Sequence, residues 1–410
     1  MKENKEKNVL PQHSKLYPVL TGIMRVALGV LTGMRFTCDE RVKDLKKGDE
    51  AFIVLCQHPS MIDAAGVFPM FAPRKVYTVA GRFQYIGKKC RKLFEMLGVI
   101  PKRQFYTDFA CVRSMLAVLK QNGVLAFMPE GRISMDGANS PIEDSTGAFV
   151  KKCGVPVVVL KLEGSHFVMG SWRKRTVHLG RARAKASLLF EKEELQALTA
   201  SQVHEKIKAA LAYNQFELQE EKRPKYLGRP VGISTNMYRC HACGGVGTFT
   251  DDGKRVTCSA CGYTLRVGLD RFFYSDKKDE TPAFSNLAAY NAWQKEVEEE
   301  FWRKEDVRLA YPAQCRSRND EGDYIKTTDG ILQLDAEKLI FTDKQGEILF
   351  SRDMQNISGV SADYTRAQFT MYEKNGALEF QLPKAYCIAQ LVNSIVILHK
   401  KATASDEVSA

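Results

Sequence analysis

Two short apolar runs, each followed at once by a polar turn, constrain the fold of this chain most strongly. The first run, residues 52–56, is followed by His58 and, five residues after the histidine, by Asp63. The second run, residues 124–128, leads into a Pro-Glu-Gly turn at 129–131. Runs of this length and composition are typical of buried strands. Ligands bind at the carboxyl ends of strands in an open α/β sheet, so both turns are expected to border one cleft.

The spacing of His58 and Asp63 predicts an acid-base pair under one geometric condition. Five residues along a regular helix rotate by about 500°, which would leave the two side chains about 140° apart. They can meet only if His58 lies in the loop before a helix that the following proline opens. A neutral imidazole could then take a proton from an attacking hydroxyl, while Asp63 fixes the tautomer. One alternative is that the histidine and the aspartate have only structural roles near a strand end. Another is a metal site, which two ligands without a local third disfavour.

Four sequence blocks in this order resemble the glycerolipid acyltransferase family, in particular the 1-acylglycerol-3-phosphate acyltransferases. The blocks are HxxxxD at 58–63, Gly-Val-Ile-Pro-Lys-Arg at 98–103, Glu-Gly-Arg-Ile-Ser at 130–134 and Gly-Val-Pro-Val-Val-Val-Leu at 154–160. The resemblance covers about residues 15 to 215. It implies an α/β domain whose mostly parallel sheet is flanked by helices.

The resemblance also implies a reaction and a set of site residues. A fatty acyl group would pass from acyl-CoA or acyl carrier protein to the free hydroxyl of a lysophospholipid, with 1-acylglycerol-3-phosphate as first candidate and phosphatidate as product. His58 and Asp63 would be the catalytic residues, and the acceptor would be bound by Arg103, Glu130, Gly131 and Arg132. A guanidinium suits a phosphate because it offers paired hydrogen bonds. Arg74 and Arg82 are further cations that could contribute to such a site. The alternative is that both are solvated surface residues.

The positive charge of the chain is concentrated in its first half. The net charge is +12, and residues 1–215 hold 34 Lys and Arg against 19 Asp and Glu, whereas residues 216–410 hold 26 against 29. A basic surface suits anionic lipid headgroups, phosphate-bearing substrates, coenzyme A or an acidic carrier protein. Nucleic acid would also be attracted, but the motifs lead us to expect no nucleic-acid partner.

The N-terminal segment 16–34 is apolar but is interrupted by Arg25. It is too short and too interrupted for a spanning helix, which needs about 20 apolar residues. Five apolar residues recur at helical spacing: Leu20, Ile23, Ala27, Val30 and Met34. They predict a helix that lies in the membrane interface, with Arg25 and Arg35 reaching lipid headgroups. The alternative is a helix packed on the core. No signal peptide is expected, so we predict a cytoplasmic protein on the inner face of the membrane.

Four of the 11 cysteines form two CxxC pairs with fourteen residues between them: Cys240, Cys243, Cys258 and Cys261. Two such turns predict a zinc ribbon with four thiolate ligands. Four protein ligands leave no position for water, so the zinc would be structural and His241 a bystander. The remaining scattered cysteines favour a reducing compartment.

The C-terminal part predicts short strands followed by one helix. The expected strands are 331–334, 339–342, 347–351, 368–372 and 377–382, and the helix is 385–400. This succession resembles a pleckstrin-homology-like domain, which is β-barrel-like with a capping helix. A second hypothesis for the whole chain is therefore a scaffold of acyltransferase fold, with little or no catalysis, that recruits partners through the ribbon and the C-terminal domain.

The predicted domain plan has seven parts. It comprises an N-terminal tail and interfacial helix (1–38), the acyltransferase domain (39–215), a linker (216–235), the zinc ribbon (236–268), a helical connector (269–322), the pleckstrin-homology-like domain (323–402) and a tail (403–410).

Overall fold

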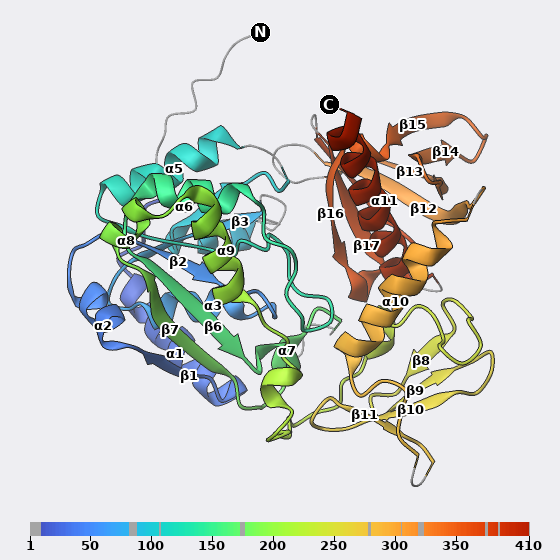
Figure 1. Ribbon diagram of the computed structural model, residues 1–410, viewed down its shortest axis with the longest axis horizontal. Coiled ribbons are helices and arrows are strands. Elements are labelled where there is room, and N and C mark those ends of the chain that lie inside the picture. Colours follow the sequence, from blue (N-terminus) through green and yellow to red (C-terminus); the bar gives the residue numbers. More distant parts are fainter. Residues whose placement is uncertain are drawn as a thin grey trace. The chain divides into compact units, whose positions relative to one another are not determined.

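In the computed structural model the chain forms two compact units. Figure 1 shows the chain coloured along its sequence. The first unit comprises residues 1–170 and 177–226, and the second comprises 171–176 and 227–410. The structure describes residues 10–81, 88–105, 108–172, 177–277, 280–304, 306–318, 324–373, 376–383 and 386–409.

The first unit is built on a seven-stranded sheet in the order β1-β7-β6-β2-β5-β3-β4. Neighbouring strands are parallel except for β6 and β7, which confirms the mostly parallel sheet. The strands are β1 (Arg35–Cys38), β2 (Phe52–Cys56), β3 (Val76–Gly81), β4 (Val99–Lys102), β5 (Val124–Phe127), β6 (Val157–Glu163) and β7 (Arg183–Phe190).

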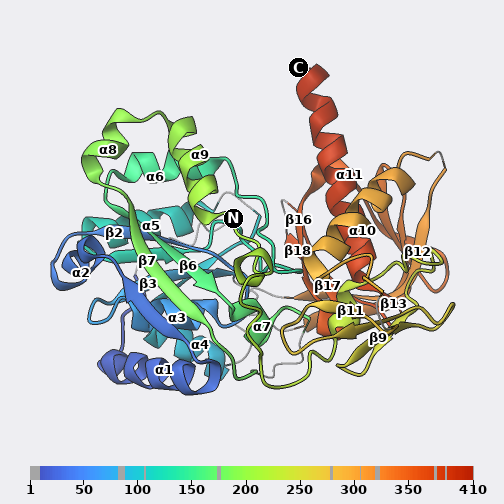
Figure 2. The same cartoon turned by 60° about the horizontal axis from the view of Figure 1, so that its bottom comes forward.

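Helices cover both faces of this sheet, with α1 and α3 on one side and α6, α8 and α9 on the other (Figure 2). They are α1 (Tyr17–Thr32), α2 (Glu40–Lys47), α3 (Asp63–Met70), α4 (Lys88–Met96), α5 (Phe109–Lys120), α6 (Ser145–Cys153), α7 (Ser165–Met169), α8 (Lys192–Ala197) and α9 (Ala200–Leu211). All five residues of β2 are buried, because the strand is covered on both faces. This explains its unbroken apolar sequence.

Helix α1 packs on the first unit through one face and exposes apolar residues on another. The hydroxyl of buried Tyr17 accepts a hydrogen bond from the Val76 N–H at 3.0 Å. The exposed apolar residues are 58% to 69% accessible: Val19, Ile23, Val26 and Val30. The exposed stripe is shifted slightly from the expected one, because Val19 and Val26 are exposed whereas Leu20 is half-buried. Met34, the last residue of the expected stripe, follows the end of α1 and is buried against α3. No described helix is long and apolar enough to cross a membrane.

The second unit contains a small four-stranded sheet and a larger antiparallel one. The small sheet has the order β11-β10-β9-β8, with β8 (Phe249–Asp251), β9 (Arg255–Cys258), β10 (Thr264–Val267) and β11 (Phe273–Ser275). The larger sheet has the order β15-β14-β13-β12-β18-β17-β16, with β12 (Leu309–Arg318), β13 (Tyr324–Leu334), β14 (Lys338–Asp343), β15 (Ile348–Asp353), β16 (Ile357–Asp363), β17 (Gln368–Glu373) and β18 (Gly376–Gln381). Helices α10 (Leu287–Phe301) and α11 (Ile388–Ser409) complete the unit.

The five strands expected in the C-terminal part correspond to β13, β14, β15, β17 and β18, and the expected helix corresponds to α11. Strands β12 and β16 were not expected. β12 lies before the predicted boundary at residue 323 and contains Pro312, which disfavours a strand because it cannot donate to the ladder. Pro312 is nevertheless paired with Ile331 of β13.

The division between the two units, after residue 226, falls within the segment predicted as a linker, 216–235, and this segment is packed. Phe216, Tyr226 and Ile233 are buried within it. In the first unit, the Tyr226 hydroxyl donates a hydrogen bond to Gln219 at 2.5 Å. Its charged and proline-bearing sequence concealed these apolar anchors.

Candidate active site

His58 follows β2 in the loop before α3, and Asp63 is the first residue of α3. The Nδ1 atom of His58 lies 3.3 Å from Oδ2 of Asp63. The imidazole therefore leans over the first turn of the helix, which is the condition that the five-residue spacing sets. The His58 side chain is 15% exposed, and its Nε2 atom has no hydrogen-bond partner among the described residues. A ring held on one nitrogen and open on the other can exchange a proton with a bound hydroxyl.

Asp63 is completely buried, and Oδ2 also accepts a hydrogen bond from the Ser60 N–H at 2.6 Å. Burial raises the pKa of Asp63, and the contacts with His58, Ser60 and Ser165 oppose this rise. These contacts favour the charged form, which is the form able to fix the tautomer of His58.

Glu130 follows β5 and holds the histidine loop through its side chain. Oε1 accepts a hydrogen bond from the His58 N–H at 3.0 Å, and Oε2 accepts one from the Ser140 N–H at 2.7 Å and one from the Tyr213 hydroxyl at 3.1 Å. Burial raises the pKa of Glu130. The carboxylate thus joins the two polar turns that the sequence placed at one sheet edge.

Several polar groups that the sequence did not single out bind the backbone of the His58 loop. Ser134 donates its N–H to the His58 carbonyl at 2.9 Å. Nδ1 of buried His166 lies 3.0 Å from the Pro59 carbonyl, and burial lowers the pKa of His166 to about 4. Neutral His166 can donate to that carbonyl through Nδ1. Its place in α7, far along the chain, gave no local signal.

Arg103 and Arg132 lie on adjoining loops of the first unit. The Gln104 side chain, next to Arg103, donates to the Gly131 carbonyl, next to Arg132, at 3.1 Å. Neither guanidinium has a hydrogen bond or ion pair with any residue that the structure describes. Gly131 has a left-handed φ of 65°, which suits a residue without a side chain.

Arg132 borders a pocket of about 260 Å³. The pocket is lined by Phe105, Glu130, Arg132, Pro141, Ile142, Glu143 and Asp144. Glu130 therefore connects this pocket to the backbone of His58. The other candidate cations differ: Arg74 donates to the carbonyls of Leu45, Glu50 and Asn122, and Arg82 lies outside the described residues.

Replacing Glu130 by glutamine is expected to lower both the stability of the protein and any activity that depends on His58. A glutamine amide group would face one or more of the three donors, and each buried donor left unsatisfied costs about 1–3 kcal/mol. Thermal unfolding and kcat/KM measure the two effects. Glu143→Gln makes the same chemical change at an exposed position of the same pocket and should leave both unchanged. An unaltered melting temperature for Glu130→Gln would contradict the role of this carboxylate.

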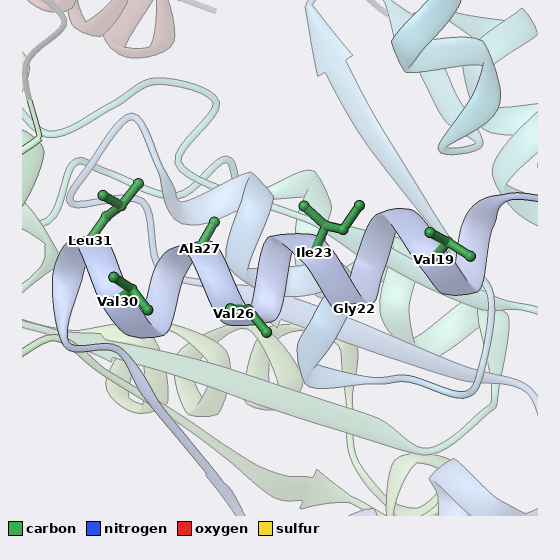
Figure 3. Close-up of a pocket in the computed structure, with 7 residues that line it drawn as sticks. All are labelled: Val19, Gly22, Ile23, Val26, Ala27, Val30 and Leu31. Atoms are coloured by element: carbon green, nitrogen blue, oxygen red, sulfur yellow. The ribbon is translucent and has the colours of Figure 1, made fainter.

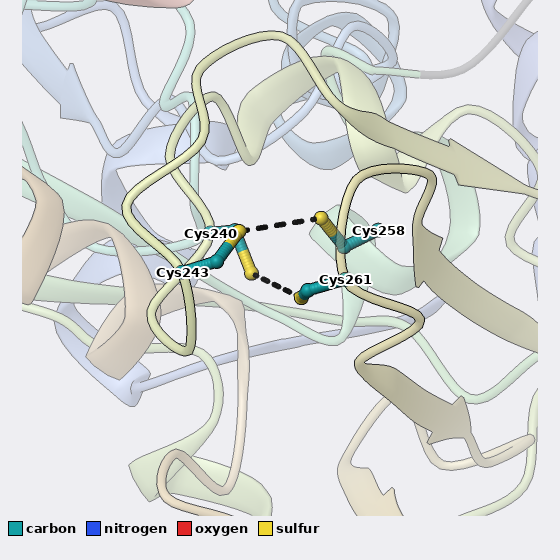
Figure 4. Close-up of side chains that lie close together, drawn as sticks. All are labelled: Cys240, Cys243, Cys258 and Cys261. Carbon is teal, nitrogen blue, oxygen red and sulfur yellow. Dashed lines mark hydrogen bonds between the residues drawn. The ribbon is translucent and has the colours of Figure 1, made fainter.

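The four cysteines of the ribbon come together in the second unit, as Figure 4 shows. The sulfur atoms lie within 4.8 Å of one another, and the Cys240–Cys261 and Cys243–Cys258 pairs are 3.8 Å apart. Zn–S bonds of about 2.3 Å place tetrahedral sulfurs about 3.8 Å apart, so the geometry fits a four-thiolate metal site. The group contains no histidine among the described residues: His241 packs its ring against Tyr263 instead.

Hydrogen bonds tie this cluster to α10. The Tyr290 hydroxyl donates to the Arg239 carbonyl at 2.8 Å and accepts from the His241 N–H at 3.1 Å. The Arg239 guanidinium lies 3.5 Å from the fully buried Glu298, which accepts a hydrogen bond from Ser394 of α11 at 2.7 Å. The first CxxC turn is therefore connected through polar side chains to both long helices of the unit.

The sheet, the histidine-aspartate pair and the Glu-Gly turn define the class to which this part of the chain belongs. Residues 34–162 match the family model described as Acyltransferase, and this segment is an acyltransferase domain. The chain is 24% identical over 146 residues to the chloroplastic 1-acyl-sn-glycerol-3-phosphate acyltransferase of Brassica napus, a match that covers 35% of this chain. It spans 41% of the length of that curated relative.

Two solved structures are similar to parts of the chain. One is PlsC, the 1-acyl-sn-glycerophosphate acyltransferase of Thermotoga maritima, with 17% identity and a TM-score of 0.40 over 50% of this chain and 80% of that one. The other is the N-terminal PH domain of human ARAP2, with 10% identity and a TM-score of 0.21 over 24% of this chain and 85% of that one.

Proposed function

We propose that the first unit transfers a fatty acyl group from the thioester of acyl-CoA or acyl carrier protein to the free hydroxyl of a lysophospholipid. The proposed acceptor is 1-acylglycerol-3-phosphate, which would give phosphatidate. The observation that carries the proposal is the 3.3 Å contact of His58 Nδ1 with Asp63, which leaves Nε2 open. The family match over residues 34–162 and the named activity of the Brassica napus relative support it.

In the proposed reaction, Nε2 of His58 takes the proton of the acceptor hydroxyl as its oxygen attacks the thioester carbonyl. The new C–O bond gives a tetrahedral oxyanion, and the charged Asp63 stabilises the imidazolium. The oxyanion then collapses, the C–S bond breaks, and the leaving thiolate takes the proton from His58. No acyl group is attached to the protein at any step.

The acceptor phosphate is proposed to lie between the Arg103 and Arg132 loops. Both guanidinium groups are without a partner in the described part of the chain, and Gly131 leaves the turn backbone uncovered. Two fixed positive charges compensate a phosphate better than water does in a partly enclosed site.

Replacing Arg132 by alanine is expected to raise KM for lysophosphatidate by about 10- to 100-fold, because hydrogen bonds to charged groups contribute about 1.5–3 kcal/mol. The change in KM for the acyl donor should be small. Steady-state kinetics measure both, with Arg113→Ala on the exposed side of α5 as the control. An equal loss with monoacylglycerol, which has no phosphate, would contradict the assignment.

We propose that the exposed apolar face of α1 binds the membrane surface. The protein would then lie in the cytoplasm, on the inner face of the membrane. Figure 3 shows this face, which is formed by Val19, Gly22, Ile23, Val26, Ala27, Val30 and Leu31. Arg25 donates to the Pro69 carbonyl at 3.2 Å and lies over the Phe36 ring. It anchors the helix to the unit rather than extending away from it.

The double substitution Ile23→Glu and Val26→Glu is expected to weaken binding to phospholipid vesicles by 100-fold or more. Burial of one such side chain is worth about 1.5–3 kcal/mol, so two together exceed about 3 kcal/mol. Vesicle co-sedimentation measures the change. Ile348→Glu, which alters an exposed isoleucine of the second unit, is the control. Unchanged sedimentation of the double variant would remove α1 as the binding element.

We propose that the four cysteines hold a structural zinc ion. The support is the sulfur spacing, which agrees with tetrahedral thiolate coordination. When bound, the metal would cross-link the two CxxC turns. It would have no open coordination position for water or a substrate. The ribbon residues would then serve the stability of the second unit.

A further inference from the structure

A strip of positive charge crosses three strands at one end of the sheet in the first unit. Arg35 of β1 is paired with Arg183 of β7, and Lys185 of β7 is paired with Lys161 of β6. Residues directly opposite each other on neighbouring strands point to the same face. All four side chains are exposed. We call this set, Arg35, Lys161, Arg183 and Lys185, the basic strip.

The basic strip lies on the sheet face opposite to α1. Phe36 faces α1, because the guanidinium of Arg25 lies 4.9 Å from the centre of its ring. Side chains alternate along a strand, so Arg35 points to the other face. On β6 the same alternation places Lys161 on the side of Val157 and Val159, which belong to the core packed against α5, α6 and α9. Figure 2 shows α1 on one side of the sheet and α6 and α9 on the other.

The strip begins beside the catalytic loop. Cys56 of β2 is paired with Leu160 of β6, and the Gln57 N–H donates to the Leu160 carbonyl at 3.1 Å. Lys161 is therefore level with Gln57, the residue before His58. Since β2 and β6 are parallel, the strip lies at the carboxyl edge of the sheet, where the candidate active site is.

The charges of the strip are hardly compensated within the protein. Arg183 lies 3.7 Å from Glu163, a contact between half-exposed side chains. The side chains of Arg35, Lys161 and Lys185 have no hydrogen bond or ion pair within the described ranges of the chain. Like charges directly opposite each other on neighbouring strands are destabilising. An acidic partner would relieve this repulsion, and complementary charge also accelerates its encounter with the protein.

We propose that the basic strip docks an acidic protein that carries the acyl chain as a thioester, in the manner of acyl carrier protein. This inference rests on the proposed function and selects one of its two donors. An anionic lipid surface is the less suitable occupant, because the apolar face proposed for the membrane is on α1, across the sheet. The strip has the breadth of three strands, roughly 10 Å between the outer two. Such a surface suits a protein, whereas a nucleotide thioester would be held in a pocket.

The test compares two donors, palmitoyl-CoA and palmitoyl-acyl carrier protein, with full-length protein and lysophosphatidate as acceptor. Lys161→Glu/Lys185→Glu is expected to raise KM for the carrier-bound donor about tenfold or more and to leave KM for palmitoyl-CoA within about twofold. The matched control, Lys120→Glu/Lys192→Glu, reverses two exposed lysines at the ends of α5 and α8 and should change neither. Added salt should raise KM for the carrier-bound donor alone.

Several outcomes would overturn the inference while leaving the proposed function intact. These are an equal effect of the strip variant on both donors, transfer from palmitoyl-CoA alone, or a strip variant that loses binding to anionic vesicles but not to the carrier. If neither donor supports transfer by the wild type, the proposed function fails. Calorimetric binding of palmitoyl-acyl carrier protein to the wild type and to the strip variant then decides the docking surface by itself: binding that the variant loses supports it, and no binding or equal binding refutes it.

Discussion

Replacing His58 by alanine is expected to lower kcat/KM for acyl transfer by about 10²- to 10⁴-fold, which is the usual contribution of a positioned general base. The loss should fall mainly on kcat, because in the proposed reaction the imidazole accepts a proton in transit and adds little to the binding of either substrate. Steady-state kinetics with lysophosphatidate measure the change. His58 is partly exposed, so circular dichroism and the melting temperature of His58→Ala should resemble those of the wild type.

Asp63→Asn is the matched variant that separates catalysis from folding. It removes the charge that is proposed to fix the tautomer of His58, so activity should fall while the acceptor oxygen for the Ser60 N–H is retained. Burial raises the pKa of Asp63 in the folded protein, so ionisation disfavours the folded state at any pH above the ordinary value of 3.8. The stability of Asp63→Asn relative to the wild type should therefore be greatest near neutral pH and should decline as the pH approaches 3.8. A variant with full activity would contradict the orienting role of Asp63.

Removing one ribbon cysteine is expected to unfold the metal site and to destabilise the second unit. Zinc binding by small four-ligand sites contributes about 10–16 kcal/mol, much of which is folding free energy. The hydrogen bonds of Tyr290 to Arg239 and His241 connect the site to α10, so Cys240→Ser should lower the melting temperature of the second unit. Metal analysis and differential scanning calorimetry measure the zinc content and the two transitions.

Cys315→Ser, which changes a cysteine of β12 outside the cluster, is the control and should retain one zinc ion per chain. Treatment of the wild type with a chelator should reproduce the effect of Cys240→Ser and leave the transition of the first unit in place. Purified wild type that contains no zinc, with a second unit that melts as Cys240→Ser does, would contradict the proposed metal site.

The parts of the fold that were predictable from sequence have local signals. The continuous apolar run of β2 reflects burial on both faces. The proline after His58 was expected to open the next helix, but α3 begins four residues after it, at Asp63. The spacing of the two CxxC pairs predicts that their four sulfur atoms come together, and they lie within 4.8 Å of one another. Each of these features is set by residues within a few positions of one another.

The groups that hold the His58 loop had no such signal. Ser134, His166 and Tyr213 reach the loop or Glu130 from separate segments, and only the folded sheet brings them together. Pro312 in β12 concealed a strand. The predicted exposed face of α1 differed from the observed one by part of a turn. Apolar residues occur around most of that helix, so their spacing could not show which side the buried Tyr17 fixes against the first unit.

The most direct measurement is transfer of radiolabelled palmitate from a thioester to lysophosphatidate by the purified wild type, with product and protein analysed together. The proposed function predicts labelled phosphatidate from the wild type, no label attached to the protein, and little product from His58→Ala. Equal background from the wild type and His58→Ala, with every donor and lysophospholipid tried, would contradict it and favour the scaffold hypothesis.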